Sequence, residues 1–177
     1  MRIFLAHGAS AGAESMQPFV DALTERDLDG QTIGLPVRRA EDAVAVYRRQ
    51  LPVSLADCVI GGHSYGGRVA SLLAVDEPPA GLVLLSYPLH RPGRPDDLRI
   101  DHWPRIRCPV LLVAGEADQF ARIELLRTSV ALLALATLVT YPGVRHGVGG
   151  RRLSETADNI RDFVKSLASA RRAGEGR

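Results

Sequence analysis

Short hydrophobic runs recur along the chain. They are rich in Val, Leu and Ile, they are almost continuously apolar, and they occupy residues 2–6, 31–35, 57–61, 81–86, 109–114 and 136–141. Runs of this kind are typical of strands that are buried on both faces of a parallel sheet. The pattern therefore predicts a mainly parallel, six-stranded sheet.

Apolar residues at helical spacing lie between most of these runs. The sets are Phe19, Val20 and Leu23; Ala43, Val46, Tyr47 and Leu51; Val69, Leu72 and Leu73; Ile123, Leu126 and Val130; and Ile160, Phe163, Val164 and Leu167. An alternation of strands and helices along a whole chain implies a doubly wound α/β fold, in which right-handed crossovers place helices on both faces of the sheet.

The segment 87–107 interrupts this alternation. It is rich in proline and arginine and has no clear period. We expect a long excursion with one short helix near residues 96–99, and no amphipathic helix that could serve as a lid. Residues 1–168 are expected to form a single domain, and the polar residues 169–177 a flexible C-terminal tail.

The composition is that of a globular protein. Of the 177 residues, 46% are hydrophobic and 24% are charged, and the net charge of +2 argues against a nucleic-acid partner. We find no signal peptide and no apolar run long enough for a membrane span. Cys58 and Cys108 are too few for a disulfide framework. We therefore expect a cytoplasmic protein with no membrane partner, whose oligomeric state the sequence leaves open.

The strongest chemical motif is Gly62-His63-Ser64-Tyr65-Gly66. It follows a predicted strand and precedes a helical pattern, which is the setting in which G-x-S-x-G exposes a serine hydroxyl above the edge of a sheet. Glycines two residues on either side of the serine let strand and helix approach without a Cβ clash. Ser64 is thus the candidate nucleophile; the alternative is a glycine-rich turn with an incidental serine.

A serine nucleophile needs a base, and the base needs an acid that orients it. Asp118 follows the fifth predicted strand and His146 follows the sixth, which gives the order Ser, Asp, His that this turn type requires. We predict Asp118 as the acid and His146 as the base. Two alternatives stay open: Asp118 as the N-cap of the following helix, and Glu116 as the orienting acid.

The loop after the first strand is the candidate oxyanion loop. Its Ala9 amide and the amide of Tyr65, directly after the nucleophile, are the expected donors. A phosphate-binding loop between Gly8 and Gly12 is disfavoured, because the G-x-G-x-x-G spacing is missing. The remaining histidines have no metal-ligand spacing, and we expect neither a metal nor a cofactor. Tyr87 and His90 are candidates for lining the cleft.

These motifs together resemble those of the α/β-hydrolase superfamily. They are Leu5-Ala6-His7-Gly8-Ala9 and the segments 61–67, 113–118 and 141–147. The chain is most similar to the small, cap-less branch of dienelactone-hydrolase-like proteins (Tex30-like), over nearly its whole length. The resemblance implies a minimal fold without a cap domain and a triad of Ser64, Asp118 and His146, with Ala9 and Tyr65 as amide donors. Dienelactone hydrolase proper has a cysteine in place of Ser64, so its lactone substrate does not carry over.

The function expected from these residues is that of a serine hydrolase. It would cleave a small ester, thioester or related acyl substrate through an acyl-enzyme. The alternatives are a non-catalytic binding or scaffold module that retains the fold, and a cofactor-free perhydrolase that uses the same residues. Arginines predicted near the mouth, Arg91, Arg94 and Arg145, would favour an anionic substrate.

Overall fold

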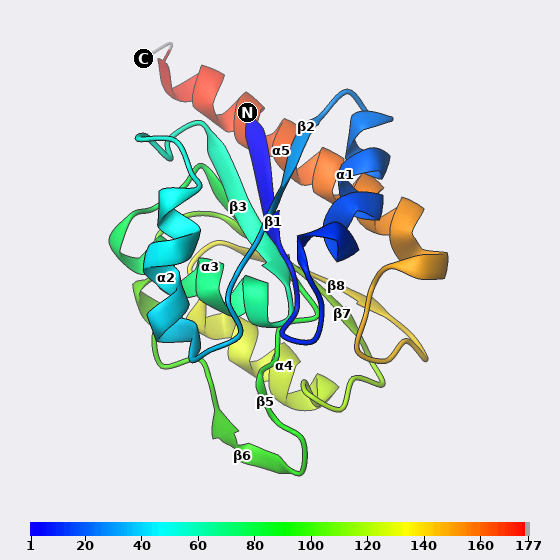
Figure 1. The fold of residues 1–177 in the computed structure, drawn as a ribbon. Coiled ribbons are helices and arrows are strands. Elements are labelled where there is room, and N and C mark those ends of the chain that lie inside the picture. The colour runs from blue at the N-terminus through cyan, green and yellow to red at the C-terminus, as the bar shows by residue number, and fades with distance from the viewer. Residues whose placement is uncertain (176–177) are drawn as a thin grey trace.

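Six parallel strands form the central sheet of the computed structural model, which describes residues 1–175 (Figure 1). In spatial order they are β2 (Asp29–Ile33), β1 (Arg2–Ala6), β3 (Cys58–His63), β4 (Gly81–Leu85), β7 (Val110–Gly115) and β8 (Ala136–Tyr141). Every neighbouring pair is parallel. The predicted sheet is confirmed, with β2 beginning and ending two residues earlier than expected.

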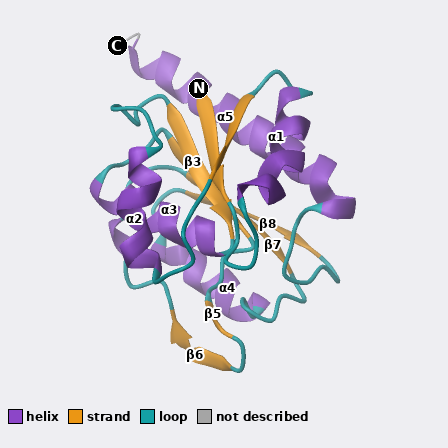
Figure 2. Cartoon of the chain, viewed as in Figure 1, coloured by secondary structure: helices purple, strands orange, loops and turns teal. Residues whose placement is uncertain are grey.

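Helices cover both faces of this sheet (Figure 2). One face carries α1 (Gln17–Thr24) and α5 (Leu153–Glu175), and the other carries α2 (Ala40–Arg49), α3 (Tyr65–Asp76) and α4 (Ile123–Ser129). Short 3-10 helices are found at Ala13–Met16, Trp103–Arg105, Val130–Leu132 and Gly150–Arg152. The doubly wound α/β architecture is therefore confirmed.

The two faces have separate hydrophobic cores, because successive side chains of a strand point to opposite sides. In β1, Ile3 and Leu5 pack with α1 and α5, whereas Phe4 and Ala6 pack with α2 and α3. The apolar runs in the sequence are nearly continuous for this reason: both faces of each central strand are buried.

The order of the strands reverses between β1 and β3. From β1 the chain passes through α1 to β2 at one edge, and from β2 it returns through α2 to β3 on the other side of β1. Loops that follow strands on either side of such a switch point diverge, which leaves a crevice at the carboxyl end of the sheet. The loop after β1 and the turn that contains Ser64 lie at this crevice.

The excursion between β4 and β7 forms a hairpin. Its strands are β5 (His90–Arg91) and β6 (Arg94–Leu98), which pair antiparallel around a turn where Gly93 has a φ of +72°. The short helix expected near residues 96–99 is thus wrong, because this segment pairs with β5. Figure 1 shows the hairpin at the carboxyl end of the sheet. No separate domain is inserted in the described part of the chain.

The C-terminal helix continues beyond the expected end of the domain. Residues from 169 onward are expected to form a flexible tail, but α5 extends to Glu175. The guanidinium of Arg171 donates a hydrogen bond to the Ala56 carbonyl and pairs with Asp57, so the last turns are tied to the loop before β3. Residues 176–177, which also belong to that prediction, lie outside the described residues. Among the described residues, no helix is long and apolar enough to cross a membrane.

The close approach of the Ser64 turn to β1 gives a stability prediction. A Cβ atom at Gly66 would lie 2.5 Å from the carbonyl oxygen of Ala6, and the backbone there cannot move aside. We expect Gly66→Ala to lower the free energy of unfolding by about 1–3 kcal/mol or more. Gly34→Ala is the matched control, since a Cβ there would meet only Ala13, at 3.9 Å. Urea denaturation of both variants checks this, and equal stabilities would contradict it.

Candidate active site

Ser64 occupies a sharp turn between β3 and α3. Its φ of +50° is in a region that residues other than glycine seldom adopt, and strain of this kind is found preferentially at functional sites. The turn is held by the Ser64 amide, which donates to the Leu85 carbonyl at 2.8 Å, and by the first helical bond of α3, from the Arg68 amide to the Ser64 carbonyl. The serine hydroxyl is thereby presented at the carboxyl edge of the sheet.

Glycines on both sides of Ser64 allow the turn to press against the end of β1. A Cβ at Gly62 would clash with the Ala6 carbonyl and with Gly66, and a Cβ at Gly66 would clash with the carbonyls of Ala6 and His7. The sequence predicts that these glycines let the strand and the helix pack closely. The structure shows that they also set the distance from Ser64 to the loop after β1.

Ser64, His146 and Asp118 form one hydrogen-bonded chain. The Ser64 hydroxyl donates to His146 Nε2 at 2.9 Å, and His146 Nδ1 donates to Asp118 Oδ2 at 2.7 Å. The Asp118 side chain is fully buried and that of His146 is 18% exposed. A buried carboxylate holds the imidazole in the tautomer whose Nε2 accepts a proton. The structure thus brings together the three residues that the sequence predicts.

The loops after β7 and β8 are tied to each other, which places Asp118 beside His146. The Ala117 amide donates to the Val144 carbonyl at 2.9 Å. Gly115 makes this contact possible, because a Cβ at that position would clash with the carbonyls of Val144 and Arg145. Asp118 Oδ1 accepts the Phe120 amide at 2.8 Å, which leaves Oδ2 directed at the imidazole.

Both alternatives for the acid fail on geometry. Glu116 accepts hydrogen bonds from Arg127 at 2.7 Å and from Thr140 at 2.8 Å. Its carboxylate therefore has other partners than His146. The N-cap position of α4 is occupied by Arg122, not by Asp118. The capping contact that Asp118 does make is a local turn, and it coexists with the bond to His146.

Ala9 and Tyr65 lie around the same pocket as Ser64. Tyr65 is the first residue of α3, so its amide has no partner within the helix. The loop that carries Ala9 is anchored by His7, whose Nε2 accepts the Leu35 amide at 2.9 Å and whose Nδ1 therefore donates to the Gly8 carbonyl at 2.7 Å. The roles of Ala9 and Tyr65 as oxyanion donors stay predictions.

His90 anchors the loop that carries the acid, a contribution that the sequence did not reveal. Its amide donates to the Phe120 carbonyl, and its Nε2 accepts the Arg122 amide, both at 3.0 Å. Phe120 in turn packs on the His146 ring, with 4.4 Å between ring centroids. His90 therefore supports the acid loop and does not line the pocket beside Ser64, and neither does the buried Tyr87. The contacts of His90 with the Arg122 amide and of Tyr87 with the Arg99 carbonyl join residues that are distant in the sequence, so the sequence carries no signal for them.

Two further histidines are held neutral. His63 lies against His146, with 5.2 Å between ring centroids, and burial followed by the proximity of His146 lowers the pKa of His63 to about 4. His102 shares a 2.8 Å hydrogen bond with Ser71, and burial followed by the charges of Arg68 and Arg105 lowers its pKa to about 4. A neutral His63 adds no positive charge beside the imidazole of His146. Within the described residues, no cluster of His, Cys, Asp or Glu could hold a metal ion.

The pocket over Ser64 has a volume of about 610 Å³ and two unlike ends. One end, on the side of α1, is lined by Met16 and Phe19 together with backbone of the loop after β8. The other end, on the side of α3, is lined by Arg68 and Arg99. The arginines at the pocket are thus not those singled out from the sequence: of these, only Arg91 lies nearby, and Arg145 lines a separate hollow beside His146.

Comparisons with known proteins identify relatives of this chain. The family model described as alpha/beta hydrolase domain matches residues 36–171. Uncharacterized protein Rv2307c of Mycobacterium tuberculosis (strain ATCC 25618 / H37Rv) is 34% identical over 163 residues, a match that covers 76% of this chain and 57% of the relative. Uncharacterized protein MT2364 of strain CDC 1551 / Oshkosh matches to the same extent. The chain therefore spans little more than half the length of the curated relatives it matches.

Solved structures share the fold at low sequence identity. A monoacylglycerol lipase of Paleococcus ferrophilus superposes with a TM-score of 0.79 at 16% identity, covering 94% of each chain. A thermophilic esterase from Thermogutta terrifontis, solved with malate bound, gives a TM-score of 0.76 at 16% identity, covering 94% of this chain and 90% of the esterase. At such identities the likeness shows a common fold.

The lowered pKa values of His63 and His102 predict a loss of stability in acid. Each stays neutral in the folded protein down to about pH 4, whereas its ordinary pKa is 6.5, so the unfolded chain binds more protons in between. The free energy of unfolding should therefore decrease as the pH falls from 6.5 to 4, by up to about 1.4 kcal/mol per pH unit for each histidine. Urea denaturation at several pH values measures this slope. His102→Gln should flatten it, and an unchanged slope in that variant would contradict the assignment.

Proposed function

The chain belongs to the alpha/beta hydrolase family, and we propose that it is a serine hydrolase that cleaves a small ester or thioester through an acyl-enzyme. The observation that carries the proposal is the hydrogen-bonded chain from Ser64 through His146 to Asp118, which opens into a pocket. A finer placement in the cap-less, dienelactone-hydrolase-like branch belongs to the same proposal and is supported by the hairpin that stands where larger folds insert a lid.

The first half of the reaction forms the acyl-enzyme. Ser64 Oγ attacks the carbonyl carbon while His146 Nε2 takes the hydroxyl proton. The buried carboxylate of Asp118 stabilises the imidazolium that results. The tetrahedral intermediate then collapses: the bond to the leaving oxygen or sulfur breaks, the leaving group receives the proton from His146, and the acyl group stays on Ser64 as an ester.

Negative charge on the carbonyl oxygen needs hydrogen-bond donors that are already in place. The amides of Tyr65 and Ala9 are the candidates, since both residues border the pocket at Ser64. The Tyr65 amide has in addition the positive end of the α3 dipole behind it. Removal of one such donor typically costs a factor of about 10²–10³ in kcat, so this pair would supply a large part of the rate.

The second half of the reaction hydrolyses the acyl-enzyme. Water attacks the ester carbon, His146 takes one proton from the water and returns it to Ser64 Oγ, and the free acid leaves. The same three side chains serve both halves, so no cofactor is needed for the chemistry proposed. The hairpin β5–β6 provides no closed lid, and a substrate with a short acyl group fits a pocket of about 610 Å³.

Replacement of the nucleophile tests the proposal most directly. Ser64→Ala should abolish both hydrolysis of short esters and labelling by a fluorophosphonate, since each needs the Ser64 oxygen, while the circular dichroism spectrum stays that of the wild type. Undiminished turnover by the folded variant would exclude Ser64 as the nucleophile. A folded wild-type protein that neither reacts with the fluorophosphonate nor hydrolyses any ester would favour a binding module that retains the fold.

The two acidic residues of the β7 loop provide a matched pair of variants. Asp118→Asn should lower kcat by about 10³- to 10⁴-fold, because the amide no longer stabilises the imidazolium or holds the correct tautomer. Glu116→Gln should change kcat by less than about threefold, since it disturbs a partly exposed ion pair with Arg127 and a hydrogen bond from Thr140, neither of which involves His146. Steady-state kinetics on a short ester decides between them, and the reverse order of effects would assign the acid to Glu116.

A further inference from the structure

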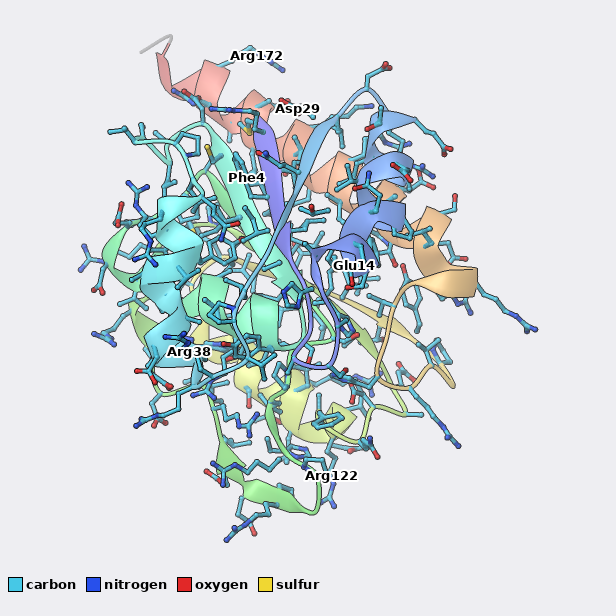
Figure 3. All side chains as sticks on the ribbon, viewed as in Figure 1. Phe4, Glu14, Asp29, Arg38, Arg122 and Arg172 are labelled. Atoms are coloured by element: carbon cyan, nitrogen blue, oxygen red, sulfur yellow. The ribbon has the colours of Figure 1, made fainter. Side chains whose placement is uncertain are left out.

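An arginine-lined surface continues from the pocket at Ser64 along the side of α3. Three adjoining hollows share Arg68 and Arg99: the pocket itself, one beneath the start of α2, and one beside the hairpin. The arginines that line them, here called the arginine cluster, are Arg38, Arg39, Arg68, Arg91, Arg99 and Arg105. Arg38 is labelled in Figure 3, at the segment that leads into α2.

Positive charge in this cluster exceeds the negative charge around it. The same hollows contain three carboxylates, of Glu41, Asp97 and Asp101. Glu41 is shared, at 2.7 Å from Arg68 and 3.8 Å from Arg39. Burial, followed by the charges of Arg68 and Arg91, lowers the pKa of Arg99. Like charges are thus held together without enough acids between them, an arrangement that favours binding of an anion.

The two arginines that line the pocket at Ser64 are held by neighbouring groups. Arg68 lies one helical turn after Ser64 on α3, its side chain is 23% exposed, and its buried Nε has no hydrogen-bond partner within the described residues. The backbone of Arg99 is held at both groups: its amide donates to the Leu89 carbonyl at 2.8 Å, and its carbonyl accepts the hydroxyl of buried Tyr87 at 2.7 Å. No ion pair of Arg99 is found among the described residues. Arg99 therefore offers its guanidinium donors to a ligand in the pocket, and Arg68, which lines the same pocket, adds positive charge beside it.

Because the pocket has an apolar end and a cationic end on opposite sides of Ser64, we propose that the substrate is an ester or thioester whose leaving alcohol or thiol carries a phosphate group. The phosphate would bind Arg68 and Arg99, and the acyl group would lie against Met16 and Phe19. This inference rests on the function proposed above and names its substrate class.

Two arguments favour phosphate on the leaving group over other anions. Guanidinium groups bind phosphate oxygens in a bidentate manner, and a dianion with three terminal oxygens can engage two arginines at once, whereas a carboxylate is satisfied by one. The cationic end is continuous with the neighbouring hollows, so a charged alcohol or thiol can leave along them after the first step. The acyl group must stay beside Ser64 until water attacks, and the apolar end suits it.

The test compares esters that differ in the charge of the leaving group. The probes are para-acetoxyphenyl phosphate, para-acetoxybenzoate and the neutral methyl para-acetoxybenzoate, with each kcat/KM divided by the rate of alkaline hydrolysis of that ester. At about pH 8 the phosphate is a dianion. We expect wild-type kcat/KM for the phosphate to exceed that for the neutral ester by about tenfold or more, with the carboxylate between them. Equal values for phosphate and carboxylate would overturn the assignment to phosphate.

Variants of the cluster show whether the preference arises at these arginines. Arg99→Gln should remove the preference for phosphate over the neutral ester, a loss of about tenfold or more, and Arg99→Lys should keep part of it because the charge remains. Arg94→Gln is the matched control, since Arg94 begins β6, five residues before Arg99, but lines none of the three hollows. A preference that survives in Arg99→Gln would overturn the proposal. A higher kcat/KM for phenyl hydrogen succinate than for para-acetoxyphenyl phosphate would also overturn the proposal, because the anion of the succinate is part of the acyl group.

A binding measurement separates this proposal from the proposed hydrolysis. Titration calorimetry with para-hydroxyphenyl phosphate, the product of the charged probe, requires no turnover. Binding that is lost in Arg99→Gln and retained in Arg94→Gln supports the phosphate subsite. If no ester is cleaved in that case, only the proposed hydrolase activity is contradicted. Hydrolysis that depends on Ser64, together with no binding of this product that depends on Arg99, would overturn the subsite alone.

Discussion

The tight contact between the Ser64 turn and the end of β1 is the constraint on which the rest of the site depends. Gly62 and Gly66 let two backbones meet at a distance that no Cβ would allow. The contact holds Ser64 in its strained conformation, places the Tyr65 amide at the start of α3, and brings the loop after β1 to the same pocket. The candidate nucleophile and both candidate oxyanion donors are thereby positioned by one packing interaction.

The other half of the site is organised by a network of backbone hydrogen bonds. The loops after β7 and β8 are joined through Ala117 and Val144, and the acid loop is joined to the hairpin through His90. Asp118 is buried behind His146 as a result, where a carboxylate acts most strongly on an imidazole because water does not screen it. The hairpin β5–β6 thus supports the loop of Asp118 through His90. The segment that follows β6 contributes Arg99 to the pocket.

The two ends of the pocket follow from the layers of the fold. Residues on the α1 side belong to one hydrophobic core, so that end of the pocket is apolar, whereas the α3 side opens toward a surface rich in arginine. A crevice that crosses the carboxyl edge of the sheet is lined by residues from both faces of the sheet. The substrate class that we propose is a direct consequence of this asymmetry, because the two groups on a scissile carbonyl must point in opposite directions from Ser64.

The sequence by itself determined the architecture and the candidates for the three aligned side chains. Continuous apolar runs are a local property of strands buried on both faces, and G-x-S-x-G between a strand and a helix is a local property of one turn, so both could be predicted from neighbouring residues. Tertiary structure alone showed that Asp118, and not Glu116, contacts His146, and that His90 supports the loop of Asp118. It also replaced the short helix expected near residues 96–99 with β6, and it placed Arg68 and Arg99, rather than Arg94 and Arg145, at the pocket. Each of these depends on which distant backbone group or charge lies within a few ångströms, and the spacing of residues along a chain contains no measure of that distance.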